Sequence, residues 1–261
     1  MIQPEFILTP FFLDQSLLEL QALANSGWVI NKPQLPDGEP QSRMSVLHEA
    51  LARKVEKSIR EGKLPVSIAG DCVTSIGVTA GLQRAGLDPL LIWFDAHGDF
   101  NTWDTTPSGF LGGMPLAMLA GLGEQTMPRA VNLQPLSQDK IILTDGRDLD
   151  PGEMELVASS GVNHLIDPKS LYEYEFPDLP VYIHFDVDII NPLDAPGMSY
   201  TATGGPRASE LGDIFRFLAQ TLRIVAISLS SWNPELDTDG ETKKTSMNLL
   251  QVLLSERSKE I

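Results

Sequence analysis

Seven short apolar runs, separated by segments with helical periodicity, restrict this chain to few folds. Several runs are apolar at every position instead of alternating with polar residues, which is typical of strands covered on both faces. Such strands, alternating with helices, form βαβ units and a parallel sheet. We therefore predict an α/β fold with three layers, α/β/α, around a mostly parallel central sheet. The runs are Glu5–Leu8, Leu64–Ala69, Pro89–Phe94, Lys140–Leu143, Asn163–Ile166, Val181–Phe185 and Arg223–Leu229.

The segments between these runs carry the spacing of amphipathic helices. In the first, Ser45 is a plausible N-cap and Gly62 a plausible stop. It follows a polar, proline-rich stretch, Asn31–Gln41, which predicts a surface loop. There is no repeat or convincing linker, so residues 1–261 are predicted to form a single domain. The expected helices are Ser45–Lys63, Val73–Ala85, Leu111–Leu122, Pro151–Ala158, Ser209–Leu222 and Thr242–Glu256.

Charge and composition argue against several classes of function. The formal net charge of −16 disfavours nucleic acid and anionic membranes as partners, because both carry phosphates. No apolar run approaches the roughly 20 residues that span a bilayer. Residues 1–15 begin without the basic region of a secretory signal. The single cysteine, Cys72, has no partner for an internal disulfide, so we expect a cytoplasmic location.

Polar residues follow three of the apolar runs. In parallel sheets, ligands bind beyond the carboxyl ends of the strands, which makes these positions the best candidates for a site. Side chains at i, i+2 and i+4 of an extended segment share one face, so each set is expected to converge. The sets are Asp71 and Cys72 in SIAGDCVTS, then Asp95, His97 and Asp99 in LLIWFDAHGDFNTW, and His184, Asp186 and Asp188 in VYIHFDVDIINP.

A cluster of carboxylates at these strand ends predicts a divalent cation. Uncompensated carboxylates packed together would repel one another and would be costly to bury. Carboxylate oxygens with one imidazole suit manganese, and less specifically zinc, cobalt or iron. Two such ions would deprotonate a water near neutral pH. Taken singly, each motif has another interpretation: Asp-x-His is often a cap or turn, and Asp186 with Asp188 could bind calcium or cap a turn.

In combination, and over residues 64–235, these motifs resemble the arginase–agmatinase–formiminoglutamase family, the ureohydrolases. The family segment Asp-Ala-His-x-Asp-x-Asn is matched without change. The segment Gly-Gly-Asp-His is matched with two differences, and Phe-Asp-x-Asp-x-x-Asp-Pro is matched with one. The matching residues are Asp95, Ala96, His97, Asp99 and Asn101; Ala69 to Cys72; and Phe185, Asp186, Asp188, Asn191 and Pro192.

The resemblance implies an arginase-like three-layer fold, a binuclear manganese site and commonly a homo-oligomer. It implies hydrolysis of a linear amidine-type C–N bond in a small guanidino, amidino or formimino compound. A single ion, or zinc or iron in place of manganese, is an alternative. By position, Asp95 and Asp186 would bridge both ions, His97 and Asp188 would complete one shell, and Asp99 would bind the other ion and the catalytic hydroxide. Asn101 and Ser108 occupy positions that read a substrate carboxylate.

Four positions depart from the family pattern. Cys72 replaces a histidine ligand, Gly112 replaces a histidine thought to shuttle protons, and Phe110 replaces a polar substrate contact. Ser231 replaces a glutamate that pairs with the guanidinium, so the charge-assisted bonds of that contact are lost. We therefore predict a hydrolase with a non-standard substrate. The alternative is a catalytically inactive arginase-like binding protein with a reduced or absent metal site.

Two residues near the predicted site have open roles. Cys72 is either a thiolate ligand, which would favour zinc or iron, or a small buried residue beside a weak ion position. His184 stands where the family usually has a small residue. It could supply an imidazole to the ion near Cys72 or orient a ligand from behind. The favoured interpretation is a core histidine bonded to the backbone.

Overall fold

A parallel sheet forms the centre of the structure, a computed structural model that describes residues 2–255. Within those residues the central sheet has eight strands in the order β4–β1–β5–β10–β9–β6–β7–β8, and every neighbouring pair is parallel. The strands are β1 (Pro4–Thr9), β4 (Val29–Ile30), β5 (Leu64–Ala69), β6 (Leu90–Asp95), β7 (Ile141–Asp145), β8 (Asn163–Leu165), β9 (Val181–Asp186) and β10 (Ile224–Ser230). A short hairpin, β2 (Phe11–Phe12) with β3 (Gln15–Ser16), stands apart from the sheet.

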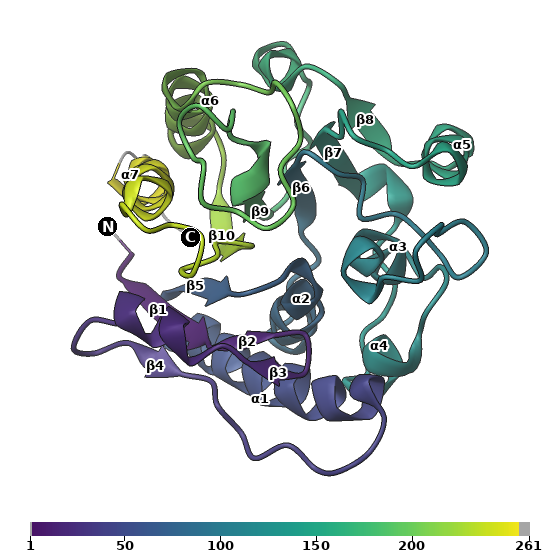
Figure 1. Cartoon of the computed structure of the whole chain (residues 1–261), viewed down its shortest axis with the longest axis vertical. Helices are drawn as coiled ribbons and strands as arrows, with labels where there is room; N and C mark the ends of the chain where they lie inside the picture. Colours follow the sequence, from purple (N-terminus) through teal and green to yellow (C-terminus); the bar gives the residue numbers. More distant parts are fainter. Residues whose placement is uncertain (1, 256–261) are drawn as a thin grey trace.

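Helices cover both faces of this sheet, which gives the predicted three layers (Figure 1). Residues of β6 alternate between two cores: Ile92 and Phe94 pack with α6 and α7, whereas Leu91 and Trp93 pack with α1 and α2. The inner strands are buried at every position, which explains their continuous apolar character. The helices are α1 (Pro40–Arg60), α2 (Ser75–Arg84), α3 (Pro115–Leu119), α4 (Thr126–Ala130) and α5 (Pro151–Ser159) on one face, with α6 (Ala208–Thr221) and α7 (Glu241–Ser255) on the other.

All seven predicted strands are present, but two predicted helices differ from the structure. The N-cap assigned to Ser45 is wrong: α1 begins at Pro40, and the Ser45 hydroxyl donates to the Gln41 carbonyl oxygen at 2.7 Å. Proline suits the first helical turn, because its missing N–H is unpaired there in any case. The predicted loop before it therefore ends two residues earlier. Gly62 is confirmed as the stop, with φ of +70°.

The predicted helix 111–122 is broken into a single 3₁₀ turn, Leu111–Gly113, and the short helix α3. Two glycines weaken helix here, and Pro115 starts a new helix instead of continuing one. The last predicted helix corresponds to α7, and its predicted end, Glu256, lies outside the described residues.

Strand order brings the polar motifs together. Strands β5, β10, β9 and β6 are successive neighbours, so residues that follow them in the sequence meet at one edge of the sheet. Ser230 at the end of β10 pairs with Asp186 at the end of β9, and Asp95 ends β6. In residues 2–255, no helix combines the length and apolar character needed to cross a bilayer.

Candidate metal centre

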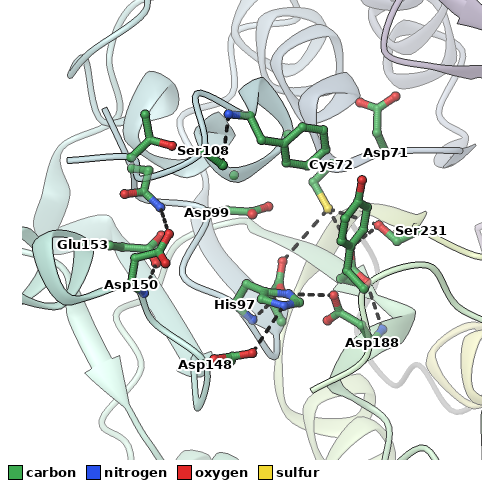
Figure 2. Close-up of a pocket in the computed structure, with 18 of the residues that line it drawn as sticks. Asp71, Cys72, His97, Asp99, Ser108, Asp148, Asp150, Glu153, Asp188 and Ser231 are labelled. Carbon is green, nitrogen blue, oxygen red and sulfur yellow. Dashed lines mark hydrogen bonds and ion pairs between the residues drawn. The ribbon is translucent and has the colours of Figure 1, made fainter. Parts of the chain in front are cut away.

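A pocket of about 190 Å³ lies beyond the carboxyl ends of these strands, and Figure 2 shows its acidic lining. Most of its residues come from the ends of β5, β6, β7, β9 and β10 and the segments that follow them, and Phe12 comes from β2. The predicted site residues that line it are Cys72, Asp95, His97, Asp99, Asn101, Ser108, Asp186 and Asp188, together with three of the departing positions, Phe110, Gly112 and Ser231. His184 lies deeper, on β9, and is fully buried.

Asp95, His97 and Asp188 converge, but not along the extended strands that the i, i+2, i+4 spacing assumed, because β6 ends at Asp95 and β9 ends at Asp186. One donor atom of each lies within 4.8 Å of the other two. His97 Nδ1 is 2.9 Å from Asp188 Oδ2 and 3.5 Å from Asp95 Oδ1. Both carboxylates are anchored by the backbone, because His97 N donates to Asp95 Oδ1 at 2.7 Å and Ala96 N donates to Asp188 Oδ1 at 3.0 Å. The three donors are thus held in place by the chain itself.

A second group of donors lies next to the first and shares Asp95 with it. One donor atom each of Cys72, Asp95, His184 and Asp186 lies within 4.8 Å of the others. The Cys72 thiol donates to Asp186 Oδ2 at 2.7 Å and lies 4.0 Å from Asp95 Oδ2. Asp99 also faces the pocket, and its buried Oδ2 has no hydrogen-bond partner among the described residues.

Burial raises the pKa of every carboxyl group in this cluster. It raises the pKa of Asp186 to about 7 and that of Asp188 to about 6, and neighbouring carboxylates add to both shifts. The pKa of Asp99 is raised well above its usual range for the same reasons. Burial alone lowers the pKa of His97, but its hydrogen bonds to Asp188 and Asp95 outweigh this and raise it to about 12.

The donor set fits divalent cations. The cluster offers the ligands that a hard or borderline cation coordinates: one imidazole and four buried carboxyl groups, whose burial disfavours ionisation. One of these groups, Asp99, has an oxygen with no hydrogen-bond partner among the described residues. A cation among them would offset the repulsion that raises their pKa values.

His184 is bonded to side chains and not to the backbone. Its Nδ1 is 2.7 Å from Ser228 Oγ and its Nε2 is 3.3 Å from Ser230 Oγ. The ring stacks on Trp93, with 3.6 Å between centroids, and the Trp93 indole N–H donates to Asp95 Oδ2 at 3.0 Å. The backbone-bonded core histidine favoured from sequence is therefore not what the structure shows.

Position 112 is filled by a neighbour's ring. A Cβ atom on Gly112 would lie 2.4 Å from ring carbons of Phe110, so the phenyl group occupies the space that a larger residue would need. Phe110 also contacts Phe12 and Tyr200, with centroid distances of 6.3 and 5.3 Å. We call Phe12, Phe110 and Tyr200 the aromatic wall; it lines one side of the pocket.

The departures at positions 72 and 231 are in contact with each other. Ser231 adopts φ of +68°, and its hydroxyl donates to Asp186 Oδ2. The same hydroxyl lies 3.6 Å from the Cys72 sulfur. Both side chains therefore satisfy the carboxylate of Asp186, and neither brings a charge that would pair with a guanidinium.

The substrate-side residues predicted from sequence both line the pocket. Asn101 donates through Nδ2 to Asp150 at 2.9 Å and accepts from Thr105 at 3.0 Å. Ser108 Oγ accepts from Phe110 N at 3.2 Å and is solvent-exposed.

Sequence reasoning missed the pocket's acidic wall, formed by Asp148, Asp150 and Glu153 (Figure 2). Glu153 Oε2 accepts from Asp150 N at 3.1 Å in the capping box of α5, and Oε1 accepts from Phe100 N at 2.7 Å. The signal was available, because this acidic segment follows β7 and begins a predicted helix. It therefore lies at the same edge of the sheet as the other motifs.

The parallel sheet and the acidic pocket at its carboxyl edge define the class of three-layer α/β/α proteins with a candidate metal centre. Within this class the chain belongs to the arginase family, whose family model matches residues 23–255. The predicted family resemblance is thereby confirmed.

Individual relatives agree. The chain is 32% identical to an arginase of Bacillus subtilis over 243 residues, which cover 87% of this chain and 82% of the relative. It is 30% identical to an arginase of Bacillus caldovelox over 224 residues, covering 80% and 75%. The crystal structure of the Bacillus subtilis arginase superposes with a TM-score of 0.82 at 28% identity, covering 99% of this chain and all of that one.

Proposed function

We propose that this protein is a metal-dependent hydrolase of a linear amidine-type C–N bond, acting on a small guanidino, amidino or formimino compound. The observation that carries the proposal is the convergence of Asp95, His97 and Asp188 at the base of the pocket, within reach of a single ion. Family membership supports a hydrolytic reaction at such a bond.

Manganese is the proposed metal, as two ions held between Asp95 and Asp186. His97 and Asp188 would complete one shell, and Asp99 would bind the other ion. When bound, such ions supply Lewis acidity and lower the pKa of a water. The chain contributes the fixed positions of these donors, which backbone N–H groups hold in place.

Asp99 is the proposed catalytic residue for proton transfer. Its Oδ2 is buried, faces the pocket and has no partner among the described residues, so it is free to accept a proton from an attacking water. The same oxygen can return this proton to the departing nitrogen. Gly112 and Phe110 offer no titratable group for that second transfer.

The proposed substrate carries less positive charge at its reacting end than arginine does. Ser231 is neutral and its hydroxyl is already donated to Asp186, so a guanidinium would find no carboxylate at this position. The aromatic wall gives that part of the pocket an apolar surface. Asn101 and Ser108, which line the same pocket, are proposed to read a carboxylate on the substrate.

A catalytically inactive binding protein is the second candidate, and one observation favours it. Cys72 and Ser231 both donate hydrogen bonds to the Asp186 carboxylate. These bonds satisfy the carboxylate in the absence of a metal ion. Such a protein would bind the same class of small molecule in the same pocket but would not turn it over.

Metal content and product release distinguish the two candidates. The purified protein is loaded with manganese, desalted and analysed for bound metal. It is then incubated with a panel of guanidino, amidino and formimino compounds, and released urea, ammonia and formamide are measured. Two retained ions with product release support the hydrolase. Ligand binding by calorimetry without product release supports the binding protein, and failure to retain metal contradicts the proposed centre.

The packing of Phe110 against position 112 leads to a separate prediction. Gly112→His is expected to lower the free energy of unfolding by about 1 kcal/mol or more, because the new side chain collides with the Phe110 ring. The double variant Gly112→His with Phe110→Ser is expected to recover most of that loss. Chemical denaturation of the parent protein, both single variants and the double variant completes a double-mutant cycle. If the changes in the free energy of unfolding add up, the two positions do not compete for space.

The remaining expectations from the sequence extend this proposal. We propose one domain over residues 1–261, since a single sheet takes strands from Pro4 through Ser230. A homo-oligomeric state and a cytoplasmic location remain predictions, which size-exclusion chromatography with light scattering and cell fractionation would test.

A further inference from the structure

The Cys72 thiol and the His184 imidazole lie together at the base of the site. The function proposed above requires neither of them. Cys72 opens the turn after β5, and His184 and Asp186 come from β9 beside Asp95 of β6. Each of the four residues is at most 5% exposed. Their donor atoms lie within 4.8 Å of one another, which is the separation expected of ligands around one ion.

We infer that Cys72 Sγ, His184 Nε2, Asp95 and Asp186 form a metal site that selects a zinc-class ion over manganese, so that the two metal positions of this pocket differ. This inference rests on the proposed function, but it replaces manganese with a zinc-class ion at the second position, the one that Asp99 also faces. A thiolate and an imidazole are soft to borderline ligands that suit zinc, cobalt or iron, whereas manganese prefers oxygen. The other position, with Asp95, His97 and Asp188, keeps the oxygen-rich set that manganese favours.

The surroundings of His184 orient the ring as a metal ligand needs. Its Nδ1 is 2.7 Å from Ser228 Oγ, and that hydroxyl is 2.7 Å from the Tyr182 hydroxyl. When Ser228 Oγ accepts from Nδ1–H, the Nε2 lone pair of His184 is left directed at the cluster. Stacking on Trp93 holds the plane of the ring.

Ser230 marks the point where the donors converge. Its hydroxyl lies 3.1 Å from Cys72 Sγ, 3.2 Å from Asp186 Oδ2 and 3.3 Å from His184 Nε2. In the metal-free protein this hydroxyl donates its one proton to Asp186 Oδ2 and lies within hydrogen-bond distance of the other two atoms. Rotation about one side-chain bond of Ser230 removes it from the centre, so an ion can take over its contacts.

Binding is balanced by release of one proton from the Cys72 thiol and of any proton that Asp95 or Asp186 carries. The thiol that now donates to Asp186 loses its proton to solvent, and the sulfur electron pair forms the bond to the metal. No redox step is involved.

Cobalt is the probe that reports the sulfur directly. A thiolate bound to Co²⁺ gives a charge-transfer absorption in the near ultraviolet, and Cys72 is the chain's only cysteine, so no other residue can produce it. Titration of the metal-free protein with Co²⁺ is expected to give this band at one equivalent per chain. Cys72→Ser is expected to lose the band while retaining cobalt at the oxygen-rich position.

Competition between metals tests the selectivity. Protein incubated with equal zinc and manganese, then desalted, is expected to hold zinc at this position, and because zinc outcompetes manganese at most such sites the variants below provide the test. Cys72→His is expected to shift that position toward manganese. His184→Gln is expected to weaken zinc retention by about tenfold or more. His48→Gln is the matched control, because His48 is another fully buried histidine, on α1 and outside the cluster, and zinc retention should not change.

The outcomes separate this inference from the proposed function. If cobalt binds but no thiolate band appears, or if Cys72→Ser and His184→Gln retain zinc like the parent protein, the thiolate–imidazole site is overturned and the oxygen-rich centre stands. If neither cobalt nor manganese binds at any ratio of metal to protein, both the thiolate–imidazole site and the proposed metal-dependent function are wrong.

Discussion

Replacing Asp186 with asparagine is expected to abolish tight metal binding and turnover, and at the same time to make the metal-free protein more stable at pH 8. Asp186 belongs to the proposed bridge between two ions, and the loss of a bridging carboxylate should lower metal affinity by more than about 100-fold, since even residues behind the ligands can cost 10–100-fold. Without a cation the same carboxylate is unfavourable: burial, and then Asp188, raise its pKa to about 7.

The stabilisation in this variant follows from its hydrogen bonds. Asp186 Oδ1 accepts from Asp188 N at 2.9 Å, and an amide oxygen can do the same. Its Oδ2 faces the hydroxyls of Ser230 and Ser231 and the Cys72 thiol, which can rotate to accept from an amide N–H. The geometry is thus kept while a buried charge is removed.

Elemental analysis after desalting and thermal melting of the metal-free form measure the two effects. Asp104→Asn is the matched control, because it removes one exposed carboxylate that is not among the pocket-lining residues and belongs to neither donor group. It should retain metal like the parent protein. If Asp186→Asn also retains metal, or if its metal-free form melts lower at pH 8, the electrostatic account of the cluster is wrong.

Strand positions and the convergence of the site were predictable from sequence for a physical reason. A strand buried on both faces is apolar throughout, so runs such as Pro89–Phe94 stand out, and their polar continuations must meet at the carboxyl edge of a parallel sheet. The spacing of Asp95 and His97 then predicts that they share a face, and the structure places both beside Asp188.

What sequence could not predict depends on contacts between distant segments. Nothing local indicates that the Phe110 ring occupies the space beside Gly112, or that the aromatic wall includes Phe12 and Tyr200. The partners of His184 lie on a neighbouring strand, and only the register of β9 against β10 places Ser228 opposite it. The start of α1, by contrast, has a local signal: Pro40 occupies the first helical position, whereas Ser45 lies inside the helix.

The departures from the family pattern are grouped in space. Cys72 and Ser231 are 159 residues apart in sequence, yet both contact Asp186, and the Cys72 sulfur lies 3.6 Å from the Ser231 hydroxyl oxygen. Gly112 and Phe110 form a second contacting pair on the pocket wall. The altered residues thus form two contacting pairs, one at the metal positions and one on the substrate side of the pocket. Restoring the family residue at one member of a pair should therefore restore less activity than restoring both members.

The metal-free protein is expected to lose stability as pH rises from 5 to 8, and a divalent cation is expected to reverse this trend. The folded pKa values of Asp188, Asp186 and Glu153 are raised to about 6, 7 and 7, and burial is the first cause of each. Unfolded carboxyl groups titrate near 4, so between about pH 4 and pH 7 the folded state binds more protons than the unfolded state, and stability falls with rising pH.

His97 acts in the same direction. Its hydrogen bonds to Asp188 and Asp95 outweigh burial and raise its folded pKa to about 12, so its contribution is fully present below the unfolded value near 6.5 and declines as pH rises above it. A cation binds the deprotonated carboxylates and competes with their protons, so its stabilising effect should grow with pH. Melting temperatures at pH 5, 6.5 and 8, with chelator and with excess manganese, measure both trends. Asp186→Asn should flatten the slope seen with chelator, and a melting temperature that rises with pH in the metal-free parent would show that these carboxylates are ionised and compensated by the protein alone.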